Sequence, residues 1–135
     1  MKYRLYVSGF SNETRSFAGK MSIGGVILKD NDYEKVFSRD IGRGSIIEAH
    51  IYGIIYGINE VSKDENVSSL TVYSTNLMIV NYLNSRNIRI PERIEGLIEN
   101  LIKSVEDFKF EINYEYFEVS DYTYVRSLAE EALKV

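Results

Sequence analysis

The stretch from Arg43 to Val61 constrains the fold of this chain more than any other. Its apolar residues recur at spacings of four, three, four and three: Ile47, Ile51, Ile54, Ile58 and Val61. This spacing places them along one stripe of an α-helix. Ser45 has a side chain that can cap the helix, and Glu48 falls in the first turn, where the helix dipole favours a carboxylate. The pattern predicts a buried helix that packs on a flat surface.

A second stripe of small residues runs beside the apolar one and consists of Ala49, Gly53 and Gly57. A glycine inside a helix costs roughly 1 kcal/mol relative to alanine. Two of them therefore predict that another part of the backbone approaches this helix closely. The helix is not a membrane span, because it is shorter than about 18 residues and carries Glu48 and His50. We expect His50 to be an exposed or satisfied helix residue, since the sequence places no second histidine or aspartate at ligand spacing.

The composition is that of one globular domain covering residues 1–135. Sixteen Lys and Arg against 20 Asp and Glu give a net charge of −4, which argues against bulk capture of nucleic acid but allows a local basic patch. The absence of cysteine excludes disulfides, thiolate nucleophiles and cysteine-based zinc sites. The first residues of the chain already have the pattern of a strand, so we expect no signal peptide and a cytoplasmic protein. Eleven Tyr, one Pro and no Cys, with many Ile, Asn and Lys, favour a thermophilic source.

Alternation and turn signals predict the remaining elements. The predicted strands are Lys2–Ser8, Lys20–Lys29, Tyr33–Ile41, Leu70–Tyr73 and Phe108–Val119, and the further helices are Asn76–Leu83, Ile90–Val105 and a last one capped by Ser120 or Asp121. The order βββαβααβα predicts an α/β fold with a mixed five-stranded sheet. The strand after the long helix should pair parallel to an earlier strand through a right-handed crossover.

Four short motifs lie on these elements, namely Val7 to Asn12, Glu48-Ala49, Leu70 to Thr75 and Val125 to Ala129. Together they resemble the type 1 ribonuclease H family. Val7 to Asn12 looks like its opening Asp-Gly-Ser loop, and Glu48-Ala49 is similar to its central-helix glutamate region. Leu70 to Thr75 resembles its fourth strand, which ends in Asp-Ser, and Val125 to Ala129 resembles its closing Ala-Asp-x-Leu-Ala. The similarity covers nearly the whole chain. It implies the ribonuclease H-like fold, with strand order 3-2-1-4-5 and helices on both faces of the sheet.

The resemblance also implies an active site, which this chain does not reproduce. In the family, four acidic side chains hold two divalent cations that cleave phosphodiesters. The equivalent positions here are Ser8, Glu48, Ser74 and Arg126, so only one carboxylate remains. We expect no metal site and no cofactor, with magnesium relevant only if residual nuclease activity exists. Our hypothesis is an ion pair between Glu48 and Arg126, with Ser8 and Ser74 completing its hydrogen bonds.

The loop before Glu48 also departs from the family's pattern. This chain has Arg43-Gly44-Ser45 where the family has a run of amide side chains that read the substrate. The candidates for nucleic-acid contact are Asn12, Arg15, Arg43 and Ser45. Three functions follow: an inactive module (a pseudoenzyme) that still binds RNA or an RNA/DNA hybrid, a protein-interaction scaffold, and a working metal nuclease with relocated ligands. The first is favoured, and the fold alone does not decide among them. The partner and the oligomeric state stay open, and no membrane association is expected.

Overall fold

The computed structural model describes residues 1–13 and 19–134. The first half of the chain forms β1 (Lys2–Ser11), β2 (Gly19–Lys29), β3 (Asp32–Gly44) and α1 (Ile46–Ser62). The second half forms β4 (Ser69–Ser74), α2 (Leu77–Ser85), α3 (Glu92–Val105), β5 (Glu111–Tyr116), the short 3-10 helix η1 (Val119–Asp121) and α4 (Thr123–Glu131). Within these ranges, no helix combines the length and apolar character needed to cross a bilayer.

The predicted order of elements is confirmed, and the differences are at the ends. The third strand continues to Gly44 instead of ending at Ile41, while the last strand begins at Glu111 and stops at Tyr116. The third helix starts at Glu92, directly after Pro91, whose fixed φ suits a helix entrance. The final helix starts at Thr123, because η1 takes up Ser120 and Asp121.

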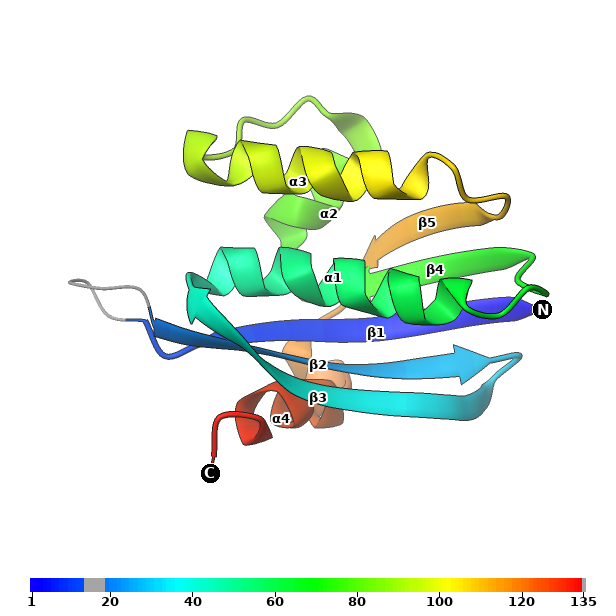
Figure 1. Cartoon of the computed structure of the whole chain (residues 1–135), viewed down its shortest axis with the longest axis horizontal. Coiled ribbons are helices and arrows are strands. Elements are labelled where there is room, and N and C mark those ends of the chain that lie inside the picture. Colours follow the sequence, from blue (N-terminus) through cyan, green and yellow to red (C-terminus); the bar gives the residue numbers. More distant parts are fainter. Residues whose placement is uncertain (14–18, 135) are drawn as a thin grey trace.

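The five strands form one sheet in the order β3-β2-β1-β4-β5 (Figure 1). The first three strands are antiparallel, and β4 runs parallel to both β1 and β5. The register of the parallel pair places Val7 of β1 beside Ser74 of β4. The predicted central first strand and parallel fourth strand are confirmed, as is the strand order.

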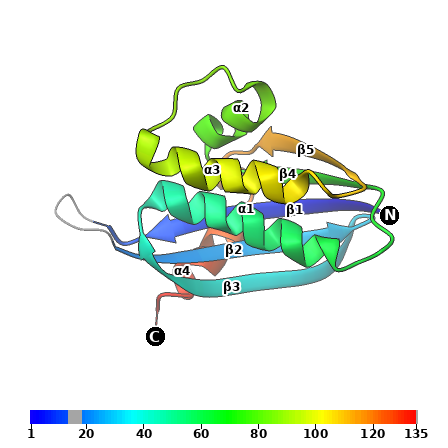
Figure 2. The same ribbon diagram turned by 45° about the horizontal axis from the view of Figure 1, so that its top comes forward.

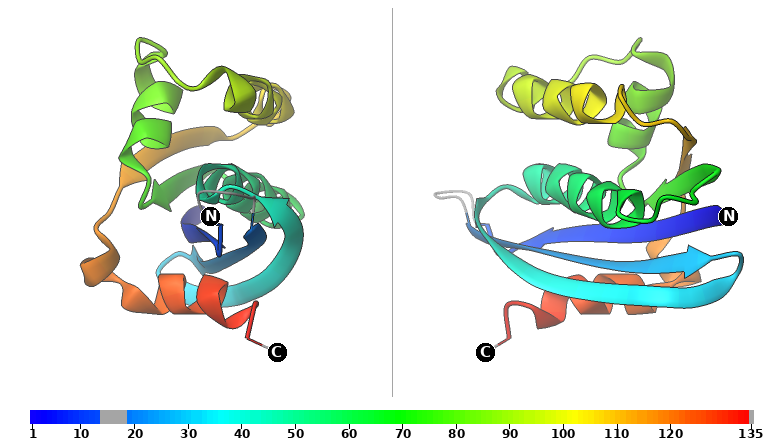
Figure 3. Two further views of the ribbon diagram at one scale, coloured as in Figure 1. Left: turned by 90° about the vertical axis from the view of Figure 1, so that its left-hand side faces the viewer. Right: turned by 45° about the vertical axis from the view of Figure 1, so that its right-hand side comes forward.

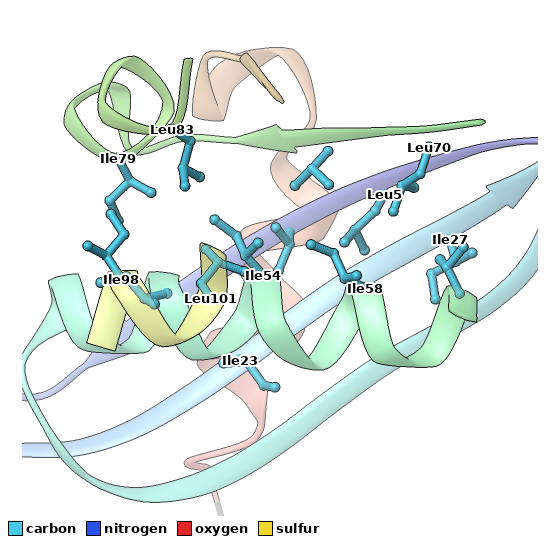
Figure 4. Packing of buried hydrophobic residues seen from close by; sticks show 14 of the residues in the cluster. Leu5, Ile23, Ile27, Ile54, Ile58, Leu70, Ile79, Leu83, Ile98 and Leu101 are labelled. Atoms are coloured by element: carbon cyan, nitrogen blue, oxygen red, sulfur yellow. The ribbon is translucent and has the colours of Figure 1, made fainter. Parts of the chain in front are cut away.

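The main core lies between one face of the sheet and helices α1, α2 and α3, with α1 and α3 side by side (Figure 2). Ile51, Ile54, Ile58 and Val61 of α1 are at most 2% exposed, as their spacing predicts. Each buried aliphatic side chain stabilises the fold by about 1.5 to 3 kcal/mol. The buried side chains of α1 share this core with Leu5, Ile23, Ile27 and Leu70 from the strands and with Ile98 and Leu101 from α3 (Figure 4).

A smaller core on the opposite face holds α4 against β1 and β2 (Figure 3). It contains Val26, Leu28, Phe117, Val125 and Leu128, closed by a stack of Tyr6 on Tyr73 with ring centroids 4.4 Å apart. Ser22 and Ser38 donate hydrogen bonds to the carbonyls of Ala129 and Leu128 near the end of α4. These bonds satisfy carbonyls that a helix end leaves free, so α4 is fixed on the sheet.

Close backbone approach occurs where strand glycines meet the helices. A Cβ on Gly9 would lie 2.3 Å from the backbone nitrogen of His50, and one on Gly24 would lie 2.3 Å from that of Ala129. The predicted close approach of another part of the backbone to α1 is therefore confirmed, at Ala49 and His50. At Gly53 and Gly57 the missing side chains make room chiefly for the side chains of Val7 and Leu5 of β1.

Candidate functional site

The four predicted site positions lie around the ends of β1 and β4, the start of α1 and the first turn of α4. Ser8 follows Val7, whose neighbour across the parallel pair is Ser74. Gly9 brings β1 against Ala49 and His50, directly after Glu48. The fold therefore collects these positions at one end of the sheet. The contacts that they make there differ from our hypothesis.

The carboxylate of Glu48 is held by the start of its own helix. Its Oε1 accepts hydrogen bonds from the Ser45 backbone N–H at 3.1 Å and from the Ser45 hydroxyl at 2.9 Å. In return the Ser45 hydroxyl accepts from the Glu48 N–H at 3.2 Å, which completes a capping box. Glu13 adds a second carboxylate, whose Oε1 accepts from the Ile46 N–H at 3.1 Å. The amides of Ser45, Ile46 and Glu48 at this helix start are therefore satisfied by side chains of the same chain.

Ser45→Ala should lower the free energy of unfolding by about 1 to 2 kcal/mol. The substitution removes the hydroxyl that accepts from the Glu48 N–H and donates to the Glu48 carboxylate. Urea unfolding at neutral pH measures the loss. Ser62→Ala is the matched control, because within the described residues the Ser62 hydroxyl bonds only the Asn59 carbonyl, at the exposed end of the same helix. Equal stability of the two variants would contradict a capping role for Ser45.

The predicted ion pair between Glu48 and Arg126 was wrong. Arg126 Nε lies 2.7 Å from Glu130 Oε1, one turn further along α4. Among the described residues Glu48 takes part in no ion pair. The physical reason is local: Glu130 is the i+4 neighbour of Arg126, and Glu48 already has partners in its capping box. The Arg126 side chain stays 48% exposed.

The two serines do not complete a shared hydrogen-bond network either. Ser74 lies on the α1 side of the sheet, like Val72, and its hydroxyl accepts from the Asn76 N–H at 3.1 Å at the entrance of α2. Side chains alternate along β1, so Ser8 lies on the α4 side with Tyr6. Both serines are buried, at 3% and 1% exposure for Ser8 and Ser74. The sheet itself therefore separates the two hydroxyls.

His50 is buried and hydrogen-bonded, so of the two predicted alternatives, an exposed or a satisfied helix residue, the structure has the second. Its Nδ1 accepts a hydrogen bond from the Gly9 N–H at 3.2 Å, so the imidazole proton belongs on Nε2. Burial, and then the positive charge of Arg126, lower the pKa of His50 to about 4. The imidazole is therefore neutral at physiological pH. It fastens α1 to β1 next to Glu48.

No protein-family model matches the sequence, and no curated protein matches it either. Solved structures do. LC11-RNase H1, isolated from compost by a metagenomic approach, has a TM-score of 0.87 at 14% identity, covering 98% of this chain and 96% of its own. RNase H1 from the halophilic archaeon Halobacterium salinarum NRC-1 has a TM-score of 0.83 at 16% identity, covering 99% of this chain and 98% of its own. The N-terminal RNase H domain of rv2228c from Mycobacterium tuberculosis has a TM-score of 0.80 at 23% identity, covering 98% of this chain and 99% of its own. The chain has the ribonuclease H fold.

The donor set at this end of the ribonuclease H fold does not fit a pair of divalent cations. The four positions offer two hydroxyls, one guanidinium and one carboxylate, and that carboxylate is bound to Ser45. Magnesium takes charged oxygens, and a fixed positive charge repels it. Across residues 1–13 and 19–134, no group of three or more His, Cys, Asp or Glu side chains is placed to hold a metal ion.

The predicted nucleic-acid contacts have unequal access to solvent. Asn12 and Arg43 are exposed at the edge of the sheet where β1 and β3 end and β2 begins. Ser45 is only 3% exposed and its hydroxyl is committed to the capping box, so its side chain positions Glu48 and is not presented to a ligand. Arg15 lies outside the described residues. Contact of Asn12 and Arg43 with nucleic acid stays a prediction.

Sequence reasoning missed two features of this region. It ended the third strand at Ile41, so the pairing of Arg43 with Lys20 of β2 was not foreseen. It also gave no role to Glu13, which caps α1 from the β1–β2 connection. The one available signal was the turn Asp30-Asn31, from which a register can be counted along the two strands. That count is wrong by two residues at Lys20, because the register shifts twice along the two strands, between Leu28 and Ile27 and between Ser22 and Met21.

A hollow of about 740 Å³ lies away from these residues, beside the connection between α2 and α3. Its wall carries Arg86 and Arg89 but also Glu92 and Glu95. Charges of both signs give it no clear preference for an anion or a cation. The Arg86 guanidinium lies over the Tyr82 ring, 5.8 Å from its centroid, and is thereby occupied within the chain. We assign no function to this hollow.

Proposed function

We propose that this chain is a nucleic-acid-binding protein that has kept the ribonuclease H fold without two-metal hydrolysis. The observation that carries the proposal is the state of Glu48. It is the only carboxylate at the four positions where the resemblance implies metal ligands, and it is bound into a capping box. The glutamate that would be a metal ligand in the family thus stabilises the start of α1 in this chain.

The chemistry of the other three positions supports the loss of hydrolysis. In two-metal catalysis the ions activate the attacking water and stabilise the leaving oxygen. Ser8 and Ser74 cannot supply the negative charge that holds such ions, and they lie on opposite sides of the sheet. Arg126 carries a permanent positive charge instead. Its effect on the pKa of His50 indicates that this charge acts on the start of α1.

Two observations favour nucleic acid as the ligand. A structural neighbour, LC11-RNase H1, has also been solved in complex with an RNA/DNA hybrid, and that structure matches this chain with a TM-score of 0.81. Exposed cations are also present at this end of the sheet, namely Lys20, Arg43 and Arg126. Cations bind phosphate whatever the base sequence, so local positive charge can act despite a net charge of −4.

Binding and cleavage assays test the proposal together. We expect the protein to bind an RNA/DNA hybrid or structured RNA at low salt, with an affinity that falls linearly with salt on logarithmic axes. We expect no cleavage of the hybrid in magnesium or in manganese. Cleavage that Glu48→Ala abolishes would disprove the loss of hydrolysis and would favour a nuclease with relocated ligands. Absence of binding at low salt to hybrid, double-stranded RNA and single-stranded RNA would disprove the nucleic-acid function.

A protein-interaction scaffold is the second candidate, and the outer strand β3 favours it. Within the described residues β3 pairs only with β2, so its other edge is open along 13 residues. Tyr33 and Val36 on this strand are 68% and 45% exposed. An open strand edge can take up an extended segment of a partner protein. The scaffold function gains support only if the binding assay above is negative.

A further inference from the structure

Two cations stand directly opposite each other where β2 and β3 meet below the start of α1. The register pairs Lys20 of β2 with Arg43 of β3, and both residues are exposed. Directly opposed residues on antiparallel strands project from the same face of the sheet at short range. We call Lys20 and Arg43 the cationic pair. Like charges in this arrangement destabilise a sheet, so the pair needs a reason other than stability.

A β-bulge creates the cationic pair. Ser22 pairs with Asp40 but Met21 pairs with Gly42, so Ile41 is an extra residue on β3. Without it the count would place Lys20 opposite Gly42 and Arg43 opposite Gly19, and no two cations would meet. Gly42 has φ of +100°, which a residue with a side chain rarely adopts, and its N–H is held by Asp40 Oδ1 at 3.1 Å. The bulge thus redirects Arg43 toward Lys20.

The nearby carboxylates do not neutralise the pair. Neither Lys20 nor Arg43 takes part in an ion pair within the part of the chain that the structure describes. The Asp40 carboxylate bonds the Gly42 N–H, and that of Glu13 bonds the Ile46 N–H. Asn12 accepts from the Lys20 backbone N–H at 2.7 Å through Oδ1, which leaves its side-chain amide donor for another partner. Two cations and an amide donor therefore gather at one exposed point.

We propose that the cationic pair binds the backbone phosphates of one nucleic-acid strand. This inference rests on the proposed function and names two residues that contact the nucleic acid. An arginine guanidinium can donate two parallel hydrogen bonds to one phosphate, while a lysine ammonium adds a compact charge beside it. A phosphate bound between them removes the repulsion that the bulge imposes. Phosphate contact carries no sequence information, so the pair sets affinity and position, and not base preference.

Fluorescence anisotropy with a labelled RNA/DNA hybrid, in a series of salt concentrations, tests the pair. We expect Lys20→Ala/Arg43→Ala to weaken binding by about 10- to 100-fold at low salt and to lower the slope of log K against log salt by about two. Lys103→Ala/Lys109→Ala is the matched control, since it removes the same charge from exposed residues of α3 and the segment after it. The control should bind like the unchanged protein.

Arg43→Glu distinguishes phosphate binding by Arg43 from a purely structural role of this residue. It places a carboxylate opposite Lys20 and should therefore raise the melting temperature while it weakens binding. If the unchanged protein binds and the double variant matches the control in affinity and slope, the inference is overturned while the proposed function stands. If the unchanged protein binds none of the nucleic acids at low salt, the proposed function fails and this inference fails with it.

Discussion

Gly9→Ala should lower the free energy of unfolding by about 3 kcal/mol or more, the upper end of what overpacking costs. The new Cβ would lie 2.3 Å from the His50 nitrogen and 2.4 Å from the Ala49 carbonyl carbon. Both atoms belong to the backbone of α1, so no side-chain rotation relieves the overlap. The helix must move away from β1, which loosens its packing on buried Leu5 and Val7 and the hydrogen bond from the Gly9 N–H to His50. Urea unfolding followed by circular dichroism measures the loss.

Gly96→Ala is the control for this substitution. Gly96 is exposed inside α3, and a Cβ there would meet nothing within 4 Å. Alanine is the better helix former, so this variant should gain about 0.5 to 1 kcal/mol. The same methyl group thus has opposite effects at the two sites, because only Gly9 carries a helix backbone directly above it. A Gly9→Ala protein as stable as the unchanged one would show that α1 can shift at little cost.

Periodicity in the sequence was sufficient to predict α1 and its buried face. Ile51, Ile54 and Ile58 recur at helical spacing, and their burial follows because a sheet can pack against one stripe only. Ser45 and Glu48 could also be assigned to the helix start, since capping depends on residues that are close in sequence. The order of strands and helices then limited the fold to few topologies, so the resemblance to ribonuclease H could be checked element by element.

The contacts of the site could not be predicted in the same way, because several partners compete for each group. Arg126 pairs with Glu130, a neighbour on its own helix, although our hypothesis paired it with Glu48. The same hypothesis placed Ser8 and Ser74 in one hydrogen-bond network, but strand alternation puts them on opposite faces of the sheet. The extra residue Ile41 places Arg43 opposite Lys20. The alternation of apolar and polar residues along a strand does not reveal a bulge of one residue.

His50 should make the protein lose about 3 kcal/mol of stability between pH 7 and pH 4. Its pKa is about 4 in the folded protein and 6.5 as a free side chain. The folded-state pKa is the lower one, so the unfolded chain binds the proton first. Stability is therefore fully present above pH 6.5 and falls as the pH drops toward 4, below which the folded protein also binds the proton. Urea unfolding at several pH values from 4 to 8 measures this dependence.

His50→Asn removes the titration and keeps an acceptor for the Gly9 N–H, because the amide oxygen can take the place of Nδ1. We expect a variant that is less stable at pH 7, since it fills less of its buried site, but whose stability changes much less between pH 7 and pH 4. Glu60 and Asp64 also lose stabilising contributions on acidification, because their pKa values are lowered to about 2 in the folded protein. That loss begins below about pH 5 and is common to both proteins, so the difference between their pH curves isolates His50.

Arg126→Gln separates the two causes of the lowered pKa. Burial of His50 is the larger cause and the Arg126 charge the smaller one, so removing that charge should raise the pKa of His50 only in part. The acid loss of stability should then be smaller than in the unchanged protein and larger than in His50→Asn. Parallel pH curves for all three proteins would mean that another group causes the acid loss. A graded series would show that the cation on α4 acts electrostatically on the buried imidazole beside Glu48.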